Sequence, residues 1–206
     1  MPKKKTPKRL AQLTPDTLLG NAIGEEQDRG SVLVGATYLE YRLYELLRGQ
    51  FRTNPEMDWE IAGDALFAPL ALLGDLWKKT TIAFLFGLIN REHYDLLEKM
   101  RNLRNHFAHH PGIVALDSKA MEPILSVITD KRQKVIARAQ DAYESGRETV
   151  YKLISRGQTY SRERIAFMEI CLMANNYLND RITEVDPAEA ESRAQMIAQL
   201  KKYGLD

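Results

Sequence analysis

Arginine, asparagine and histidine recur at helical spacing just before residue 110. Arg101, Asn105 and His109 step by four residues, which places them along one side of a helix, and Arg104 lies between this side and the apolar side. Arginine binds phosphate through its planar guanidinium and stabilises negative charge that develops there. Histidine exchanges a proton near neutral pH. These groups suffice for metal-independent RNA cleavage, in which a base activates the 2′-hydroxyl and arginine neutralises the attacked phosphate.

The same spacing limits this chemistry. On one ideal helix, Arg104 and His109 lie about 140° apart around the axis. They share a site only if the helix unwinds near His109 or if two chains meet there. Basic residues in a last helical turn also stabilise the helix dipole and bind its free carbonyls, and spacing alone favours this capping role over catalysis. Arg101, His106 and His110 are candidate binding residues in the same segment.

We expect neither a metal nor a cofactor. A histidine metal site would need acidic or further imidazole ligands, and the sequence has no H-E-x-x-H pattern. It also has no glycine-rich phosphate loop, no G-x-S-x-G elbow and no EF-hand loop.

Two charged residues, one in a predicted amphipathic helix and one in an apolar segment, are further candidates. Glu40 lies opposite the apolar face of a long predicted helix and could orient a basic group, although a solvated surface carboxylate is the interpretation that composition favours. Lys79 interrupts an apolar segment and could pair with a carboxylate, although extension of its ammonium to solvent is favoured. Both are candidate binding residues.

Bulk properties exclude several classes of protein. The net charge of +1 lacks the basic excess of a duplex-DNA binder, so specific DNA binding is not expected. The single cysteine, Cys171, excludes an internal disulfide and is typical of a reducing compartment. No stretch of about 18 uncharged apolar residues could span a membrane. We therefore expect a soluble, cytoplasmic protein.

Helical periodicity dominates the first half of the chain. A helix is predicted from about Glu25 to Arg52, and its apolar residues step by three and four: Val32, Ala36, Leu39, Leu43, Leu46, Leu47 and Phe51. A second helix is predicted near residues 75–86 and ends at Gly87. A third is capped by Asn90 and runs to about Ala108. Its apolar face consists of Leu96, Met100, Leu103 and Phe107.

The second half continues the pattern. Ser118 is predicted to cap one long helix with an apolar series at Ile124, Ile128, Val135, Ala139 and Tyr143. Ser161 is predicted to cap another helix, with Ile165, Met168, Leu172 and Leu178 inward. A last helix is predicted over residues 187–202. We expect an all-α bundle of six or seven helices without a β-sheet, with a disordered basic tail at 1–13 and a single helical domain at 14–206.

The residues also resemble a known family. Residues 104–109 match the R-N-x-x-A-H form of the Arg-x4-6-His motif of HEPN-superfamily helical domains. Short stretches of the chain resemble the mannitol operon repressor (MltR) family, namely residues 29–36, 38–40, 87–89, 94–96 and 101–105, with Lys79 at the family's lysine position. Residues 161–164 resemble its later helix. The resemblance covers about residues 25–180 and leaves out the basic tail and the last helix.

This resemblance implies an all-helical fold and a homodimer whose two motifs face each other. In active HEPN ribonucleases, the residues matching Arg104 and His109 are catalytic and the residue matching Asn105 supports them. MltR-like members are instead transcriptional regulators without a recognisable DNA-binding module. The apolar segment Ala65–Ile89 also favours a homodimer, with a monomer core as the alternative.

Two functions therefore stand side by side. The first is an MltR-like negative regulator of gene expression that acts through a regulatory protein partner. The alternative is a metal-independent HEPN-type endoribonuclease, a toxin or defence effector that cleaves RNA and is neutralised by an antitoxin.

Overall fold

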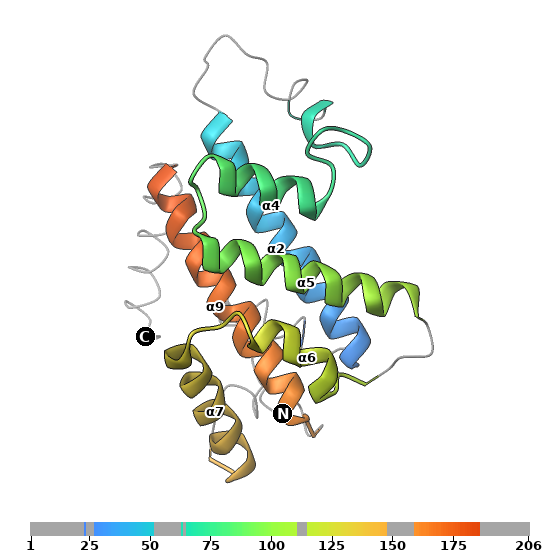
Figure 1. The fold of residues 1–206 in the computed structure, drawn as a ribbon, viewed down its shortest axis with the longest axis vertical. Coiled ribbons are helices and arrows are strands. Elements are labelled where there is room, and N and C mark those ends of the chain that lie inside the picture. Colours follow the sequence, from blue (N-terminus) through green and yellow to red (C-terminus); the bar gives the residue numbers. More distant parts are fainter. Residues whose placement is uncertain are drawn as a thin grey trace, which may run out of the picture.

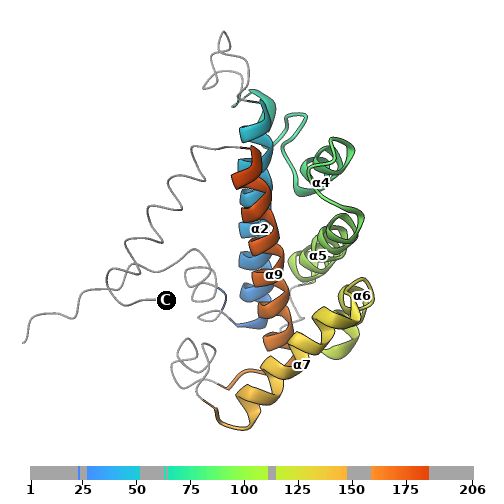
Figure 2. The ribbon, with the colours of Figure 1, turned by 90° about the vertical axis from the view of Figure 1, so that its left-hand side faces the viewer.

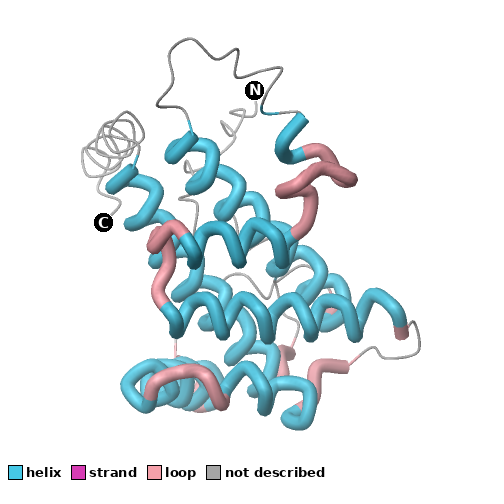
Figure 3. The backbone as a smooth tube through the Cα atoms, turned by 45° about the horizontal axis from the view of Figure 1, so that its top comes forward, coloured by secondary structure: helices cyan, strands magenta, loops and turns pink. Residues whose placement is uncertain are grey.

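The described part of the chain is helical. The computed structural model describes residues 23, 27–51, 63, 65–110, 115–147 and 159–185, except for the side chain of Val185. Within these ranges, helices are joined by turns and no strand occurs (Figure 3). The prediction of an all-α fold is confirmed. None of the described helices combines the length and apolar character that a membrane-spanning segment requires.

Two long helices form the centre of the fold. Helix α2 (Asp28–Phe51) and helix α9 (Arg162–Val185) run side by side along their lengths (Figure 2). At Gly35, an added Cβ would lie 2.9 Å from the Cys171 sulfur and 3.0 Å from the Phe167 ring, so glycine permits the close approach of the helices. Burial raises the pKa of the Cys171 thiol.

The remaining helices cover this pair. Helix α4 (Leu76–Leu85) and helix α5 (Arg91–His109) both pack against α2 and against each other (Figure 1). Helix α6 (Ser118–Leu125) packs against α5 and α9, and helix α7 (Asp130–Glu144) packs against α9. Helix α5 therefore has neighbours on two sides, α2 and α4 on one side and α6 on another.

Polar caps define where these helices begin. The side chains of Asp75, Asn90 and Ser161 accept a hydrogen bond from the backbone N–H three residues further on, at 2.9, 3.0 and 3.1 Å. Gly87 follows α4 with a φ of 68°, which allows the chain to turn toward α5. The caps at Asn90 and Ser161 and the turn at Gly87 agree with the sequence.

The predicted apolar faces are buried. In α2 the buried members are Val32, Ala36, Leu39, Leu43, Leu46 and Leu47, and in α5 they are Leu96, Met100, Leu103 and Phe107. In α9, Ile165, Met168 and Leu178 are buried, whereas Leu172 is half-buried. These faces meet in one hydrophobic core.

One helix prediction was wrong. The segment from Ser118 to Tyr143 is two helices, α6 and α7, separated by a turn at residues 126–129. Pro123 lies in α6, lacks a backbone N–H and disfavours continuation of the helix. The cap of α6 is Asp117, one residue before the predicted Ser118. Because α7 starts anew, Val135 is exposed, although it belongs to the predicted apolar series.

Two further predictions fall outside the described residues. The basic tail at 1–13 and the helix at 187–202 lie in segments 1–22 and 186–206. The boundaries of the single domain at 14–206 therefore stay a prediction.

Candidate functional site

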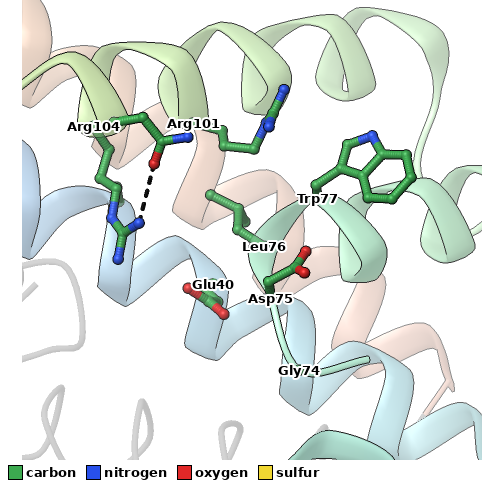
Figure 4. Close-up of a pocket in the computed structure, with 9 residues that line it drawn as sticks. Glu40, Gly74, Asp75, Leu76, Trp77, Arg101 and Arg104 are labelled. Atoms are coloured by element: carbon green, nitrogen blue, oxygen red, sulfur yellow. Dashed lines mark hydrogen bonds between the residues drawn. The ribbon is translucent and has the colours of Figure 1, made fainter. Parts of the chain in front are cut away.

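A polar pocket of about 360 Å³ lies where α2, the start of α4 and the second half of α5 meet (Figure 4). It contains four of the candidate residues from the sequence, one from α2 and three from α5. The residues that line it are Ala36, Glu40, Gly74, Asp75, Leu76, Trp77, Arg101, Arg104 and Asn105. The volume lies within the usual range for small-ligand sites.

The guanidinium of Arg104 has no ion-pair partner among the described residues. Its Nη1 donates a hydrogen bond to Oδ1 of Asn105 at 3.1 Å, marked by the dashed line in Figure 4. Among the described residues, no carboxylate lies within ion-pair distance of Arg104. Most of the donors of this guanidinium are therefore available for an anion.

Arg101 is held differently. Its Nη2 donates to Oε2 of Glu98 at 3.1 Å, and its guanidinium points in a different direction from that of Arg104 (Figure 4). The Nε–H of Arg101 is buried and has no acceptor within the described part of the chain. The two arginines thus do not converge on one point, and Arg104 is the more available cation.

Glu40 and Lys79 form an ion pair. The Lys79 Nζ lies 2.7 Å from Oε1 of Glu40, and the exposed fractions of the two side chains are 7% and 26%. The expectation that Glu40 is a solvated carboxylate and that Lys79 extends to solvent was wrong. Helix α4 packs against α2, so it brings the lysine to Glu40, where the carboxylate compensates the buried ammonium.

The opposite side of the pocket carries an acid and an indole. Burial alone would raise the pKa of Asp75, but hydrogen bonds from the backbone and side chain of Lys78 hold it below its usual value. The side chain of Trp77 is 47% exposed beside it. Asp75 is the N-cap of α4 and Trp77 lies in its first turn. Neither residue was a candidate in the sequence. The capping aspartate was the signal that would have pointed to this corner.

The three histidines lie away from this pocket. Helix α5 continues without interruption through His109, so it does not unwind to bring His109 to Arg104. His109 is exposed and is not among the described residues that line the pocket. His110 is the C-cap residue, and its Nδ1 lies 2.9 Å from the carbonyl of His106. This contact agrees with a capping role for His110.

Chemically, the pocket is suited to binding an anion. Arg104 and Asn105 provide a cation and an amide, whereas the carboxylates of Glu40 and Asp75 are each engaged with a lysine. No imidazole lines it within the described ranges, so one chain does not place a histidine base beside Arg104. In the described residues, no three histidine, cysteine or acidic side chains come together as metal ligands.

Comparison with known proteins identifies the fold. No protein-family model and no curated protein matches the chain. The structure is similar to a chain in the X-ray structure of the MtlR–HPr complex from Escherichia coli, with a TM-score of 0.50 and 16% sequence identity. The similarity covers 81% of this chain and 99% of that chain. The protein therefore has an MtlR-like fold, in agreement with the resemblance to the mannitol operon repressor family.

Proposed function

We propose that this protein is an MtlR-like negative regulator of gene expression, which acts through protein contacts and has no DNA-binding module of its own. Two findings support the proposal: the MtlR-like fold, and the fact that the similar structure is a complex with HPr. The near-neutral net charge is consistent with a protein partner in place of duplex DNA.

The observation that carries the proposal is an exposed apolar set around α4. Five of the seven large apolar side chains that are exposed in the described residues lie between residues 70 and 86. They are Leu70 (99% exposed), Leu72 (69%), Trp77 (47%), Leu85 (71%) and Phe86 (58%). Aromatic and aliphatic side chains concentrated in one exposed segment are typical of a protein interaction site.

Binding to HPr tests the proposal. The full chain is titrated with HPr of the same organism by isothermal calorimetry, alongside Leu85→Glu and the control Val135→Glu. Val135 is also an exposed apolar helix residue, 42% exposed, but it lies on α7. We expect Leu85→Glu to weaken binding at least about tenfold, because a charge in the apolar contact is desolvated without a partner. Absence of HPr binding, or equal loss in both variants, contradicts the proposal.

The same apolar set supports a homodimer as part of the proposal. Sedimentation equilibrium at micromolar concentration is expected to give twice the chain mass of 23.6 kDa. Leu85→Glu distinguishes the two uses of these exposed side chains. A variant that loses HPr but remains dimeric assigns the exposed apolar set to HPr, whereas a monomeric variant assigns it to the second copy. A wild-type chain that stays monomeric at all concentrations contradicts the homodimer.

A metal-independent endoribonuclease is the second candidate, favoured by the guanidinium of Arg104, which lies in a ligand-sized pocket and forms no ion pair with any described residue. This function requires His109 from a second chain, because α5 does not unwind at its end. Wild-type protein would cut single-stranded RNA in EDTA and leave cyclic phosphate ends. His109→Ala and Arg104→Ala would abolish cutting, whereas Arg91→Ala, an exposed arginine at the other end of α5, would not. Intact RNA after incubation with a dimeric wild-type protein contradicts this candidate.

A further inference from the structure

A second cleft lies on another side of α5, between α5 and α6, with a volume of about 580 Å³. Its apolar surface comes from Leu103 on α5 and from Ala120, Pro123 and Ile124 on α6. Leu103 and Ile124 also belong to the hydrophobic core, at 6% and 1% exposure, so the floor of the cleft is the outer surface of that core. The apolar part of a ligand would gain binding free energy by displacing water from this floor.

Two lysines and a histidine surround this floor. On α5, Lys99 and His106 are seven residues apart and therefore lie on the same side of the helix as Leu103. On α6, Lys119 lines the cleft from the opposite wall. Among the described residues, neither lysine has a carboxylate partner and the His106 ring nitrogens have no hydrogen-bond partner. The two ammonium groups at this cleft therefore have no ion-pair partner in the described part of the chain.

The single acidic residue among those described at the cleft is Asp117, and it already has a role. Its carboxylate accepts the backbone N–H of Ala120 at 2.8 Å and caps α6. The remaining polar group on the lining is the amide of Asn102. The cleft thus combines an apolar floor with a net positive rim, which is complementary to a molecule with an apolar chain and an acidic head group.

We propose that the α5–α6 cleft binds a small amphipathic organic anion, such as a medium-chain carboxylate, with its chain on Leu103 and Ile124 and its head group between Lys99 and Lys119. The size of the cleft matches a small-molecule site. The proposal does not rest on the proposed function, because the cleft uses a different face of α5 from the Arg104 pocket and shares no residue with the exposed apolar set. On a regulator, such a ligand would act as an effector.

The test measures binding of decanoate to the full chain by isothermal calorimetry. Decanol and decyltrimethylammonium, which have the same chain with no charge and the opposite charge, are measured in parallel. We expect decanoate to bind more tightly than either. Equal binding of all three shows a nonspecific apolar contact and overturns the proposal, as does the absence of decanoate binding.

Two matched pairs of variants locate the ligand. Lys99→Gln/Lys119→Gln is expected to weaken decanoate binding about fivefold, whereas Lys131→Gln/Lys134→Gln, exposed lysines on α7, leaves it unchanged. Ala120→Leu fills the cleft and is expected to abolish binding, whereas Ala137→Leu, at an exposed position on α7, does not. Circular dichroism confirms folding of each variant. Decanoate binding that survives Ala120→Leu overturns the proposed location.

Two further binding experiments test whether the cleft binds acidic head groups that belong to a membrane or to a protein. Vesicles of phosphatidylglycerol present acidic head groups on a membrane surface, and an acidic amphipathic peptide presents them on a protein. If vesicles or the peptide bind in a Lys99- and Lys119-dependent way while decanoate does not, the cleft is a docking surface and the proposal is wrong. Leu85→Glu is expected to lose HPr binding and to keep decanoate binding. The proposed function and the proposed ligand site can therefore fail independently of each other.

Discussion

The two ends of α5 contain histidines in opposite environments. At the N-terminal end, the ring of His93 is buried at 2% exposure and stacks on Tyr177, with ring centroids 3.4 Å apart and an angle of 7°. At the C-terminal end, His106, His109 and His110 are all exposed. His93, His106 and His109 lie on the same helix and His110 is its C-cap residue, so the difference comes from the neighbouring elements.

Each ring nitrogen of His93 has a partner. Nδ1 lies 2.7 Å from Oδ1 of Asn90 and donates to it, so Nε2 is left to accept from Nη1 of Arg132 at 3.2 Å. Burial, followed by the positive charge of Arg132, lowers the pKa of His93 to about 3. The neutral ring therefore joins the start of α5 to α7 and α9. A histidine with saturated contacts therefore stabilises the fold, whereas the exposed rings of His106 and His109 remain accessible to ligands.

The largest expected effect is loss of stability when the buried ring is removed. His93→Ala deletes the stack on Tyr177, leaves a cavity and removes a hydrogen-bond partner from Arg132. We expect the free energy of unfolding at pH 7 to fall by about 3 kcal/mol. His109→Ala, the exposed counterpart on the same helix, should change it by less than about 0.5 kcal/mol. Urea unfolding measures both, and similar losses in the two variants would remove the distinction.

The second prediction concerns pH. The pKa of His93 is lower in the folded state, about 3, than the value of 6.5 that it has without burial. Protons therefore bind preferentially to the unfolded chain between these values, and stability is lost as pH falls through this window. We expect the free energy of unfolding to fall by about 2 kcal/mol between pH 6.5 and 4.5 through this one group.

A non-titrating variant isolates this contribution. His93→Gln should lack the decline between pH 6.5 and 4.5, and His109→Gln should retain it. The range ends above the usual pKa of carboxylates, so acids such as Asp75 contribute little within it. Parallel pH dependences for wild type and His93→Gln would show that the ring does not stay neutral in the folded protein.

Long periodic segments made much of this fold predictable from the sequence. The apolar faces of α2 and α5 follow a 3.6-residue period over many turns, and burial of one face is the only stable outcome. The break between α6 and α7 was missed because the apolar series from Ile124 to Tyr143 happens to continue the helical step across the turn. The period of apolar residues gives no sign of a change in helix direction.

The site was predictable in part for the same reason. Arg101, Arg104 and Asn105 share the pocket because their spacing sets their directions on one helix. His109 is one turn further along, at the last residue of α5, and does not line the pocket. Contacts between distant segments left no local signal. Lys79 meets a carboxylate 39 positions away in sequence, and the partners of His93 on α7 and α9 are at least as remote from it.

The smallest expected effect comes from the hydroxyl of Tyr177. It accepts a hydrogen bond from the backbone N–H of Asn90 at 2.9 Å, while its ring stacks on His93. Tyr177→Phe keeps the stack and removes only this acceptor, so we expect a loss of about 1 kcal/mol in the free energy of unfolding. Tyr94→Phe is the control, because its ring packs against Phe84 and its hydroxyl has no hydrogen-bond partner in the described part of the chain.

Hydrogen exchange gives this variant a local readout. The N–H of Asn90 should exchange faster in Tyr177→Phe than in wild type, because it loses its acceptor, and the amides in the last turn of α5 should be unchanged. That outcome would assign the hydroxyl to holding the start of α5 against α9. Faster exchange along the whole of α5 would instead mean that the two ends of the helix open together, and the contrast between them would then apply to ligand access and not to stability.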